Sequence, residues 1–354
     1  MLSSDPAIPV DPGEISNPDA LAAFLQDRVP GLRAPIRFFK FTAGNSNLSY
    51  LVRAADRELV LKREPPGAKS RSAHDMRREY RVISAVRPHY PLAPNPLLIC
   101  EETELLGGVF FVMDRVDGVI VRQDNAASLS DFQARDQFLR LISALADLHD
   151  LDVSAGELAG LGRPEGYRER QVSGWTARMG DAHTSDACPS VDIERWLLEN
   201  LPTEAQQPAL VHNDFKMDNL AWDTGDPTRL VAVLDWEMAT LGDPLMDLGV
   251  TLSFWPEPSD PESFRAQRAM PSLRDRIPSR AEAWGAYLAL RGLSSTSFGF
   301  YLCFALYRRA VIEQQKYYRF TSGHSRDPRF SGLNLAAGAL LDMCRGQIEA
   351  SVQA

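Results

Sequence analysis

Residues 210–223 read LVHNDFKMDNLAWD and place one His, three Asp, one Lys and two Asn between apolar flanks. The apolar runs on either side predict two short strands, so the polar residues lie on the loop between them. Within this loop, His212, Asp214 and Asn219 form the pattern H-x-D-x-x-x-x-N. A polar surface loop would explain the composition, but it would not explain why apolar strands flank it.

Composition limits the class of protein. The chain has 354 residues, of which 44% are hydrophobic and 24% are charged, as in soluble globular proteins with one large or two smaller cores. No apolar run is long enough to span a bilayer, and the N-terminal segment lacks the features of a signal peptide, so we expect a cytoplasmic protein without membrane contact. Four scattered Cys without C-x-x-C spacing argue against disulfides and a zinc site. The net charge of −9 argues against nucleic-acid binding.

The order of expected elements predicts an α+β fold with two lobes. Apolar and β-branched runs predict three antiparallel strands over residues 36–64, a helix over 72–88, and two further strands joined by a Gly-Gly turn. Beyond residue 118 long helical patterns dominate, apart from short strands within 210–236. We therefore predict a small antiparallel-sheet lobe over residues 1–114, which includes an N-terminal arm and helix, and a larger mainly helical lobe over 115–354. One amphipathic helix is expected to bury Leu139, Ile142, Leu145 and Leu148.

Phosphoryl transfer from ATP requires positioning and charge neutralisation, and the chain offers the required parts in order. A small-residue loop between two strands is suited to phosphates, although a simple hairpin turn would also explain it. Lys62 lies in the next strand and Glu79 in the following helix, the order of a nucleotide-binding Lys–Glu pair. The alternative for Lys62 is a solvent-facing residue on a sheet edge. The small-residue loop suited to phosphates consists of Gly44, Asn45, Ser46 and Asn47.

The H-x-D-x-x-x-x-N loop supplies the candidate catalytic residues. Asp214 is suited to orient an acceptor hydroxyl and take its proton. Lys216 is suited to neutralise charge on the γ-phosphate, although an ordinary solvated Lys is an equal alternative. His212 belongs to the same pattern and is included as a candidate catalytic residue. Asp235 ends an apolar strand, where a charge is costly unless it is paired, so Asn219 and Asp235 form a hard-oxygen pair suited to Mg²⁺.

Two motifs, HNDFKMDN (212–219) and LDWEMATLGDPLMDLG (234–249), resemble the protein-kinase-like superfamily, and within it the aminoglycoside phosphotransferase and choline kinase branch. The resemblance extends from about residue 36 to residue 340. It implies a two-lobed kinase-like fold, ATP between the lobes, and Mg²⁺ on Asn219 and Asp235. It also implies that Asp247 braces the catalytic loop. The family usually has Gly where this chain has Asn213, so the side chain must point away from the phosphates or the loop must shift. Adenine contacts are implied for Met113, Asp114, Arg115 and Val116.

Two longer stretches narrow the resemblance. They read GLGRPEGYRERQVSGW (160–175) and FALYRRAVIEQQKYYR (304–319). Both resemble the kinase domains fused to certain acyl-CoA dehydrogenases and their free-standing bacterial relatives.

The expected phosphate acceptor is a small molecule with a hydroxyl group. Only seven residues separate Asp235 from Asp243, which leaves little platform for a peptide. From residue 243 onward, 13 basic and 11 acidic residues favour a hydroxy acid or hydroxyacyl-CoA over a polycationic aminoglycoside. An aminoglycoside acceptor and a non-catalytic pseudokinase remain alternatives, and a homodimer is one option for the oligomeric state. The aromatic residues of 298–318 would line an acyl pocket or, more commonly, a helix core. The basic cluster in this part of the chain, which is more commonly a solvated surface, is Arg265, Arg268, Arg274, Arg276 and Arg280.

Overall fold

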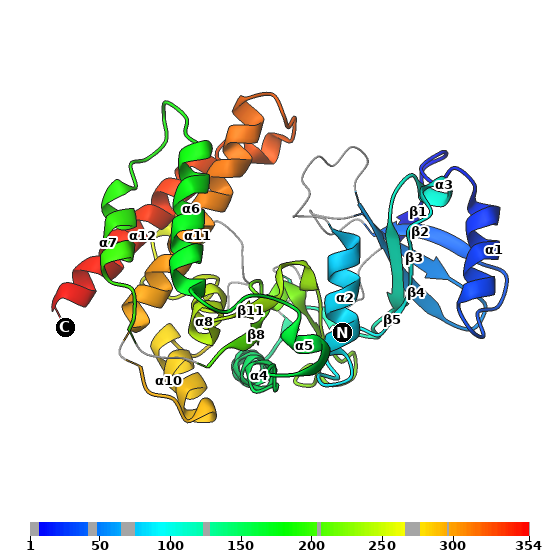
Figure 1. Cartoon of the computed structure of the whole chain (residues 1–354), viewed down its shortest axis with the longest axis horizontal. Helices are drawn as coiled ribbons and strands as arrows, with labels where there is room; N and C mark the ends of the chain where they lie inside the picture. The colour runs from blue at the N-terminus through cyan, green and yellow to red at the C-terminus, as the bar shows by residue number, and fades with distance from the viewer. Residues whose placement is uncertain are drawn as a thin grey trace. The chain divides into compact units, whose positions relative to one another are not determined.

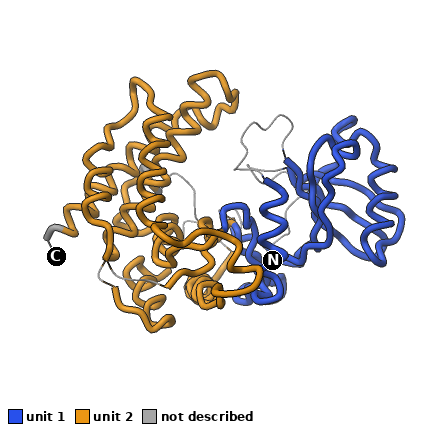
Figure 2. The backbone as a smooth tube through the Cα atoms, viewed as in Figure 1, with its two compact units in different colours: residues 1–121, 219–239 blue, residues 122–218, 240–354 orange. Residues whose placement is uncertain are grey.

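The chain divides into two compact units (Figure 2). Unit 1 comprises residues 1–121 and 219–239, and unit 2 comprises residues 122–218 and 240–354. The predicted lobe boundary at residue 114 stays a prediction. The computed structural model describes residues 7–41, 48–64, 75–122, 128–203, 207–265, 277–295 and 297–353.

Unit 1 is built on a six-stranded antiparallel sheet with the order β1-β2-β3-β4-β6-β5 (Figure 1). The three strands expected between residues 36 and 64 are confirmed as β2, β3 and β4. The strand β1, within the expected N-terminal arm, adds to the edge at β2. The strands are β1 (Ala7–Pro9), β2 (Arg37–Phe41), β3 (Leu48–Arg53), β4 (Glu58–Arg63), β5 (Pro96–Cys100) and β6 (Phe110–Asp114).

Helices cover the two faces of this sheet. Helix α1 (Pro18–Arg28) and the short helix α3 (Thr103–Leu106) contribute to an apolar core with Leu59 and Leu61 of β4. Side chains alternate along a strand, so Lys62 points to the opposite face, where α2 (Met76–Val86) packs against β5 and β6. Strand parity therefore places Lys62 beside α2 and away from the apolar core.

A second, three-stranded sheet completes unit 1. Its order is β10-β9-β7, with β7 at Val119–Ile120, β9 at Leu220–Trp222 and β10 at Leu230–Val233. The 3₁₀ helix η3 (Trp236–Met238) follows β10 and contacts α2. Segment 219–239 thus returns to the first part of the chain and carries Asp235 with it.

Unit 2 is mainly helical. The long helices α11 and α12 run side by side, and α11 also packs against α8 (Figure 1). A two-stranded sheet pairs β8 (Ala209–Val211) with β11 (Thr240–Gly242), and the 3₁₀ helices η2 (Met217–Asn219) and η4 (Pro328–Phe330) complete the elements. The helices are α4 (Asp131–His149), α5 (Gly156–Ala159), α6 (Tyr167–Asp181), α7 (Val191–Glu199), α8 (Pro244–Ser253), α9 (Glu262–Arg265), α10 (Arg280–Arg291), α11 (Phe298–Thr321) and α12 (Leu333–Gln353).

The predicted α+β class is confirmed, with two local corrections. Leu139 was expected on the buried face of α4 but is 39% exposed, because Phe138 and Leu141 continue the buried stripe instead. The connection between β5 and β6 is not a simple Gly-Gly turn, because α3 is inserted and ends at Gly107 in the left-handed conformation. Within the described part of the chain, no helix combines the length and apolar character needed to cross a bilayer.

Candidate functional site

Lys62 forms a buried ion pair in unit 1. Its Nζ lies 2.6 Å from Oε1 of Glu79 and 3.3 Å from Oδ1 of Asp235. Lys62 is 7% exposed and Glu79 is 1% exposed, so the alternative of a solvent-facing lysine is wrong. Burial alone would lower the pKa of Lys62, but the carboxylates of Glu79 and Asp235 outweigh it and raise the pKa above its usual value. The lysine therefore stays charged at any physiological pH.

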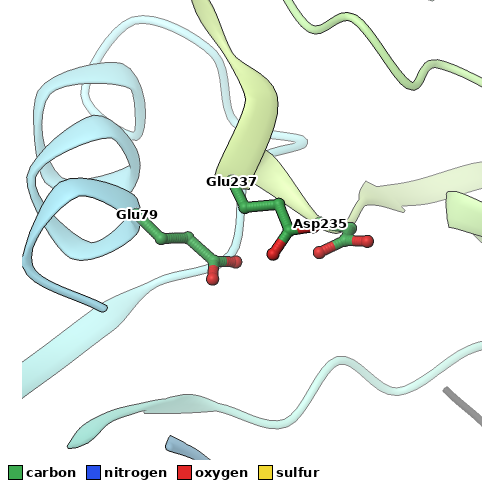
Figure 3. A group of neighbouring side chains, drawn as sticks. All are labelled: Glu79, Asp235 and Glu237. Carbon is green, nitrogen blue, oxygen red and sulfur yellow. The ribbon is translucent and has the colours of Figure 1, made fainter. Parts of the chain in front are cut away.

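Three carboxylates converge around this lysine. Glu79 points from α2 toward Asp235 and Glu237, which come from the segment after β10 (Figure 3). One oxygen of each lies within 4.8 Å of the others. With Lys62 the group carries a formal charge of −2, and carboxylate oxygens are the ligands that Mg²⁺ prefers, so the donor set fits that ion. The sequence did not single out Glu237, although its place two residues after Asp235 was the available signal.

Backbone geometry orients the acidic residues. Asp235 has a φ of 66°, a left-handed conformation that Asp tolerates better than most residues. The main-chain carbonyl of Asn219 accepts a hydrogen bond from Leu234 N at 2.7 Å, which fixes Asn219 beside the residue that precedes Asp235. Arg78 of α2 donates to the carbonyls of Glu237 and Ala239 and so anchors η3. The two predicted Mg²⁺ ligands, Asn219 and Asp235, thus lie on one tethered segment of unit 1.

The candidate catalytic loop belongs to unit 2. Nζ of Lys216 lies 2.9 Å from the Asp214 carboxylate and 5.0 Å from the centre of the Phe254 ring. Lys216 is therefore paired with the proposed base and is not an ordinary solvated lysine. Both side chains are partly exposed, so solvent or a ligand has access to them.

Asp247 braces this loop, as the resemblance implied. It is buried and accepts hydrogen bonds from the main-chain N–H of His212 at 2.6 Å and of Asn213 at 2.7 Å. Its other neighbour is Nε2 of His149 at 3.1 Å, and Nδ1 of His149 lies 2.6 Å from the Tyr287 hydroxyl. Burial by itself would raise the pKa of Asp247, but the hydrogen bonds and nearby His149 lower it. The carboxylate thus stays ionised beneath the loop.

His212 and Asn213 are held inside unit 2. The His212 side chain is buried and packs edge-to-face on Phe215, with ring centres 5.6 Å apart. Asn213 has a φ of 65°, which explains why glycine suits this position in the family. Its Oδ1 accepts a hydrogen bond from the Tyr167 hydroxyl at 3.2 Å. The catalytic role of His212 stays a prediction, and its burial suits a positional role better than contact with substrate.

Two buried arginines of α11 lie within electrostatic reach of Asp214. Arg308 donates to the main-chain carbonyl of Asn213 at 2.9 Å, and Arg309 donates to the carbonyl of Ser253. Burial lowers the pKa of both guanidinium groups, that of Arg309 to about 10, and the Asp214 carboxylate acts in the opposite direction. Two positive charges of α11 therefore act on Asp214, and the carboxylate of Asp218 acts on it in the opposite direction.

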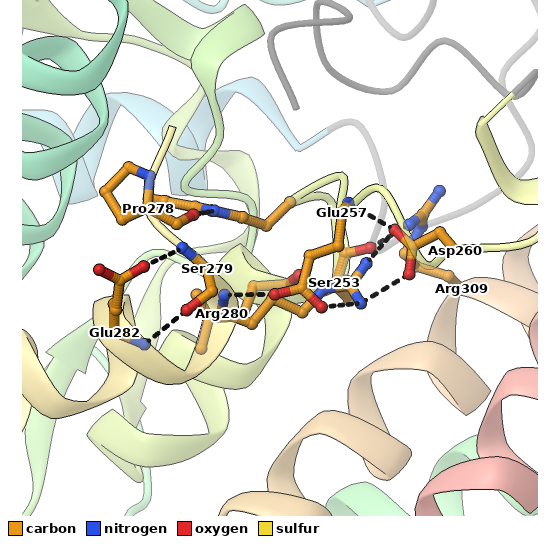
Figure 4. A network of polar contacts seen from close by, with 10 residues as sticks. Ser253, Glu257, Asp260, Pro278, Ser279, Arg280, Glu282 and Arg309 are labelled. Carbon is orange, nitrogen blue, oxygen red and sulfur yellow. Dashed lines mark hydrogen bonds and ion pairs between the residues drawn. The ribbon is translucent and has the colours of Figure 1, made fainter. Parts of the chain in front are cut away.

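The basic cluster was predicted to be a solvated surface or an anion site. Arg280, one of its residues, is neither. Arg280 is 4% exposed, and its guanidinium binds Asp260 at 2.8 and 2.6 Å and Glu257 at 3.3 Å (Figure 4). These two carboxylates neutralise the positive charge of Arg280 inside the protein, and the contacts hold the segment after α8. Arg268, Arg274 and Arg276 and the side chain of Arg265 lie outside the described residues.

The remaining predicted residues lie in unit 1 or outside the described part of the chain. Met113 and Asp114 end β6, and Arg115 pairs with Glu58 while Asp114 accepts a hydrogen bond from Asn95 at 2.7 Å. The proposed adenine contacts of residues 113–116 stay a prediction. The phosphate loop, Gly44, Asn45, Ser46 and Asn47, lies outside the described residues.

Four aromatic residues of α11 form helix core, as the commoner alternative predicted, whereas Tyr318 of the same run is 37% exposed. Phe300, Tyr301, Phe304 and Tyr307 are buried, and the Tyr307 hydroxyl donates to Glu194 at 2.8 Å. These residues therefore do not line an open acyl pocket.

Comparison with known proteins agrees with this geometry. The sequence profile of the phosphotransferase enzyme family matches residues 39–286. Acyl-CoA dehydrogenase family member 11 from Homo sapiens is 31% identical over 314 residues, which are 86% of this chain and 40% of that protein. The chain thus spans about two fifths of the length of the curated relatives it matches.

Solved structures share the fold. A protein from Ralstonia eutropha, provisionally named an aminoglycoside phosphotransferase, is 26% identical, with a TM-score of 0.78 over 93% of this chain and 98% of that one. A thermostable mutant of aminoglycoside phosphotransferase APH(4)-Ia, bound to AMP-PNP and hygromycin B, is 17% identical, with a TM-score of 0.59 over 92% of this chain and 98% of that one. These likenesses confirm the resemblance drawn from the motifs and the protein-kinase-like fold.

Proposed function

Because the chain belongs to the phosphotransferase enzyme family, we propose that it transfers the γ-phosphate of ATP to a hydroxyl group of a small molecule. The observation that carries the proposal is the buried contact of Lys62 with Glu79 and Asp235. A lysine held by two carboxylates in this way is preorganised to bind nucleotide phosphates, since its charge and position are already fixed. A merely structural ion pair would not require the third carboxylate, Glu237, beside it.

The residues of unit 1 fit a metal–nucleotide complex. Lys62 would contact the phosphates, Asn219 and Asp235 would ligate Mg²⁺, and residues 113–116 would contact adenine. Bound Mg²⁺ would neutralise charge on the phosphate oxygens. The kinase-like neighbour described above binds an ATP analogue, AMP-PNP, which supports ATP as the phosphate donor here. A cytoplasmic location, expected from the sequence, would supply both Mg²⁺ and ATP.

The residues of unit 2 would act on the acceptor. Asp214 would orient the acceptor hydroxyl and take its proton, and Lys216, paired with Asp214 at 2.9 Å, would neutralise charge that develops on the transferred phosphoryl group. Asp247 keeps the loop in place through two main-chain N–H groups.

The charges around Asp214 favour an anionic acceptor. Lys216 pairs with this carboxylate at 2.9 Å, and the buried Arg308 and Arg309 act on it electrostatically against the like-charged Asp218. A polycationic aminoglycoside would be repelled by these basic groups, whereas a carboxylate or a CoA phosphate would be attracted. The curated relatives are named acyl-CoA dehydrogenases, which supports an acyl compound. We therefore favour a hydroxy acid or a hydroxyacyl-CoA thioester as the acceptor.

A transfer assay with [γ-³²P]ATP and Mg²⁺ tests the proposal. The acceptors are hydroxy fatty acids, their CoA thioesters, choline and aminoglycosides, and each hydroxy acid is matched by the same acid without the hydroxyl group. We expect label on hydroxy acids or hydroxyacyl-CoA, no label on the deoxy controls, and loss of transfer in Asp214→Asn. Label on aminoglycosides alone would overturn the acceptor class, and absence of transfer across the panel would count against the enzyme class.

A further inference from the structure

The two longer stretches singled out in the sequence, residues 160–175 and 304–319, meet at a single residue of the catalytic loop. Tyr167 and Trp175 belong to the stretch 160–175, on α6, and Arg308 belongs to the stretch 304–319, on α11. Tyr167 and Arg308 both donate hydrogen bonds to Asn213. We propose that Tyr167 and Arg308 are positioning residues that clamp Asn213 and thereby orient the proposed base, Asp214. The kinetic part of this inference rests on the proposed function.

Three polar groups of Asn213 each have a separate partner. Its main-chain N–H donates to Asp247 at 2.7 Å, its main-chain carbonyl accepts from Arg308 at 2.9 Å, and its Oδ1 accepts from Tyr167 at 3.2 Å. Glycine would keep the two main-chain contacts but would lack the third. The asparagine therefore gains a tether that the residue usual in the family cannot form.

The position of the Tyr167 side chain is fixed by contacts other than the one with Asn213. It begins α6 directly after Gly166, whose φ is 60°, and its ring packs so closely on Gly242 that a Cβ there would lie 2.6 Å from the ring. Burial raises the pKa of Tyr167 to about 12, and the hydrogen bond with Asn213 opposes this shift. The hydroxyl thus stays protonated and donates to Oδ1 throughout the physiological pH range.

Arg308 fixes the other side of the same residue. The arginine is 5% exposed, and its guanidinium lies 5.2 Å from the centre of the Trp175 ring. Trp175 follows Tyr167 by eight residues, so both project from the same side of α6. The stretch 160–175 therefore contributes twice. Tyr167 contacts Asn213 directly, and Trp175 supports Arg308, which makes the second contact.

The clamp acts on Asp214 through the backbone. The carbonyl of Asn213 and the main-chain N–H of Asp214 belong to one planar peptide group. Arg308 holds the carbonyl of Asn213, and Tyr167 holds the Asn213 side chain. The peptide group that joins Asn213 to Asp214 therefore has little freedom to rotate, and the Asp214 side chain keeps its direction. Loss of the clamp should therefore reduce turnover more than nucleotide affinity, since Lys62, Glu79 and Asp235 belong to a different segment.

A double-mutant cycle on the full chain tests the clamp. Tyr167→Phe removes one hydroxyl, Asn213→Gly removes its acceptor while tolerating the positive φ, and the third variant combines both changes. We expect Tyr167→Phe to lower kcat about fivefold with the KM for ATP unchanged, a typical loss for one buried hydrogen bond. In the Asn213→Gly background the same change should have less than a twofold effect, because the contact is already absent.

Hydrogen exchange of the loop gives a readout that does not depend on activity. In Tyr167→Phe the amides of residues 212–214 should exchange several-fold faster, and in the Asn213→Gly background Tyr167→Phe should cause no further increase. The matched control is Tyr307→Phe, which loses a buried tyrosine hydrogen bond of 2.8 Å to Glu194. That variant should be less stable to heat but should keep normal kcat and normal exchange of the loop amides.

Two results would overturn the clamp. One is a Tyr167→Phe effect on kcat that is equally large with and without Asn213, because the two residues would then act independently. The other is unchanged exchange of residues 212–214 in Tyr167→Phe. If the wild-type protein shows no turnover at all, the proposed function fails, and the exchange measurement alone decides whether the clamp exists.

Discussion

Replacement of Asp247 by Asn tests how the catalytic loop is held. In the wild-type protein one carboxylate oxygen accepts the N–H of Asn213, and the other faces the N–H of His212 and Nε2 of His149. An asparagine side chain has a single acceptor oxygen. In either orientation of the amide, its NH₂ group therefore faces at least one main-chain N–H, which is left without an acceptor in a buried site.

The expected loss can be estimated from these contacts. A buried hydrogen bond to a charged group contributes about 1.5–3 kcal/mol, and the stranded donor adds a desolvation cost, so we expect Asp247→Asn to lower the free energy of unfolding by about 2–4 kcal/mol. For a unit of this size that corresponds to a fall in Tm of about 4–16 °C. Because the loop is no longer fixed, kcat should fall by at least about 100-fold, the scale of small displacements of catalytic groups.

Thermal and urea denaturation of the wild-type protein and Asp247→Asn measure this loss. Asp192→Asn is the matched control, because Asp192 pairs with Arg345 at the surface at 2.8 Å and should contribute less than about 1 kcal/mol. The folded-state pKa of Asp247 is lowered, so its contribution is present above the unfolded pKa of about 3.9 and is lost as the pH falls through the lower folded pKa. Equal stability and turnover of Asp247→Asn and wild type at pH 7 would refute this account of the loop.

Three further predictions concern the other charged groups. Lys62→Met should weaken Mg-ADP binding at least about tenfold in calorimetric titration, and binding equal to wild type would argue against its contact with phosphates. Asp235→Asn should raise the Mg²⁺ concentration needed for half-maximal nucleotide binding by about 10-fold or more while the far-UV spectrum stays unchanged, and an unchanged Mg²⁺ dependence would remove Asp235 as a ligand. Arg280→Met should lower the free energy of unfolding by about 3–5 kcal/mol, because Asp260 is left buried without its partner, and turnover per folded molecule should stay normal. Urea denaturation measures this loss, and an unchanged midpoint would mean that the pair does not stabilise the protein.

Much of the site could be predicted from local sequence patterns. Lys62 lies one residue after Leu61 in a strand, so alternation alone places it on the face opposite the apolar core, where the next helix packs. Asp214 and Asn219 were found because their spacing is carried by one short loop. Glu79 was found because it lies in the helix that follows the strand carrying Lys62, the order of a nucleotide-binding Lys–Glu pair.

Other features depend on contacts between segments that are distant in sequence. Tyr167 and Arg308 reach Asn213 across 46 and 95 residues, and no local pattern encodes such contacts. Arg280 was read as part of a basic surface because its acidic partner, Asp260, is brought to it only by the fold. Leu139 was misplaced because several apolar residues of α4 fit a helical stripe about equally well, and packing decides which of them is buried.

The most direct test of the central claim is a comparison of wild type and Asp214→Asn for two properties in the same preparation. Calorimetric titration measures Mg-ADP binding, and phosphate release measures slow ATP hydrolysis without an acceptor. We predict that Asp214→Asn binds Mg-ADP with an affinity within about threefold of wild type but loses hydrolysis by at least about 100-fold. Equal hydrolysis by the two proteins would contradict the assignment of Asp214 as the base, and absence of nucleotide binding by wild type would contradict the proposed phosphotransferase function.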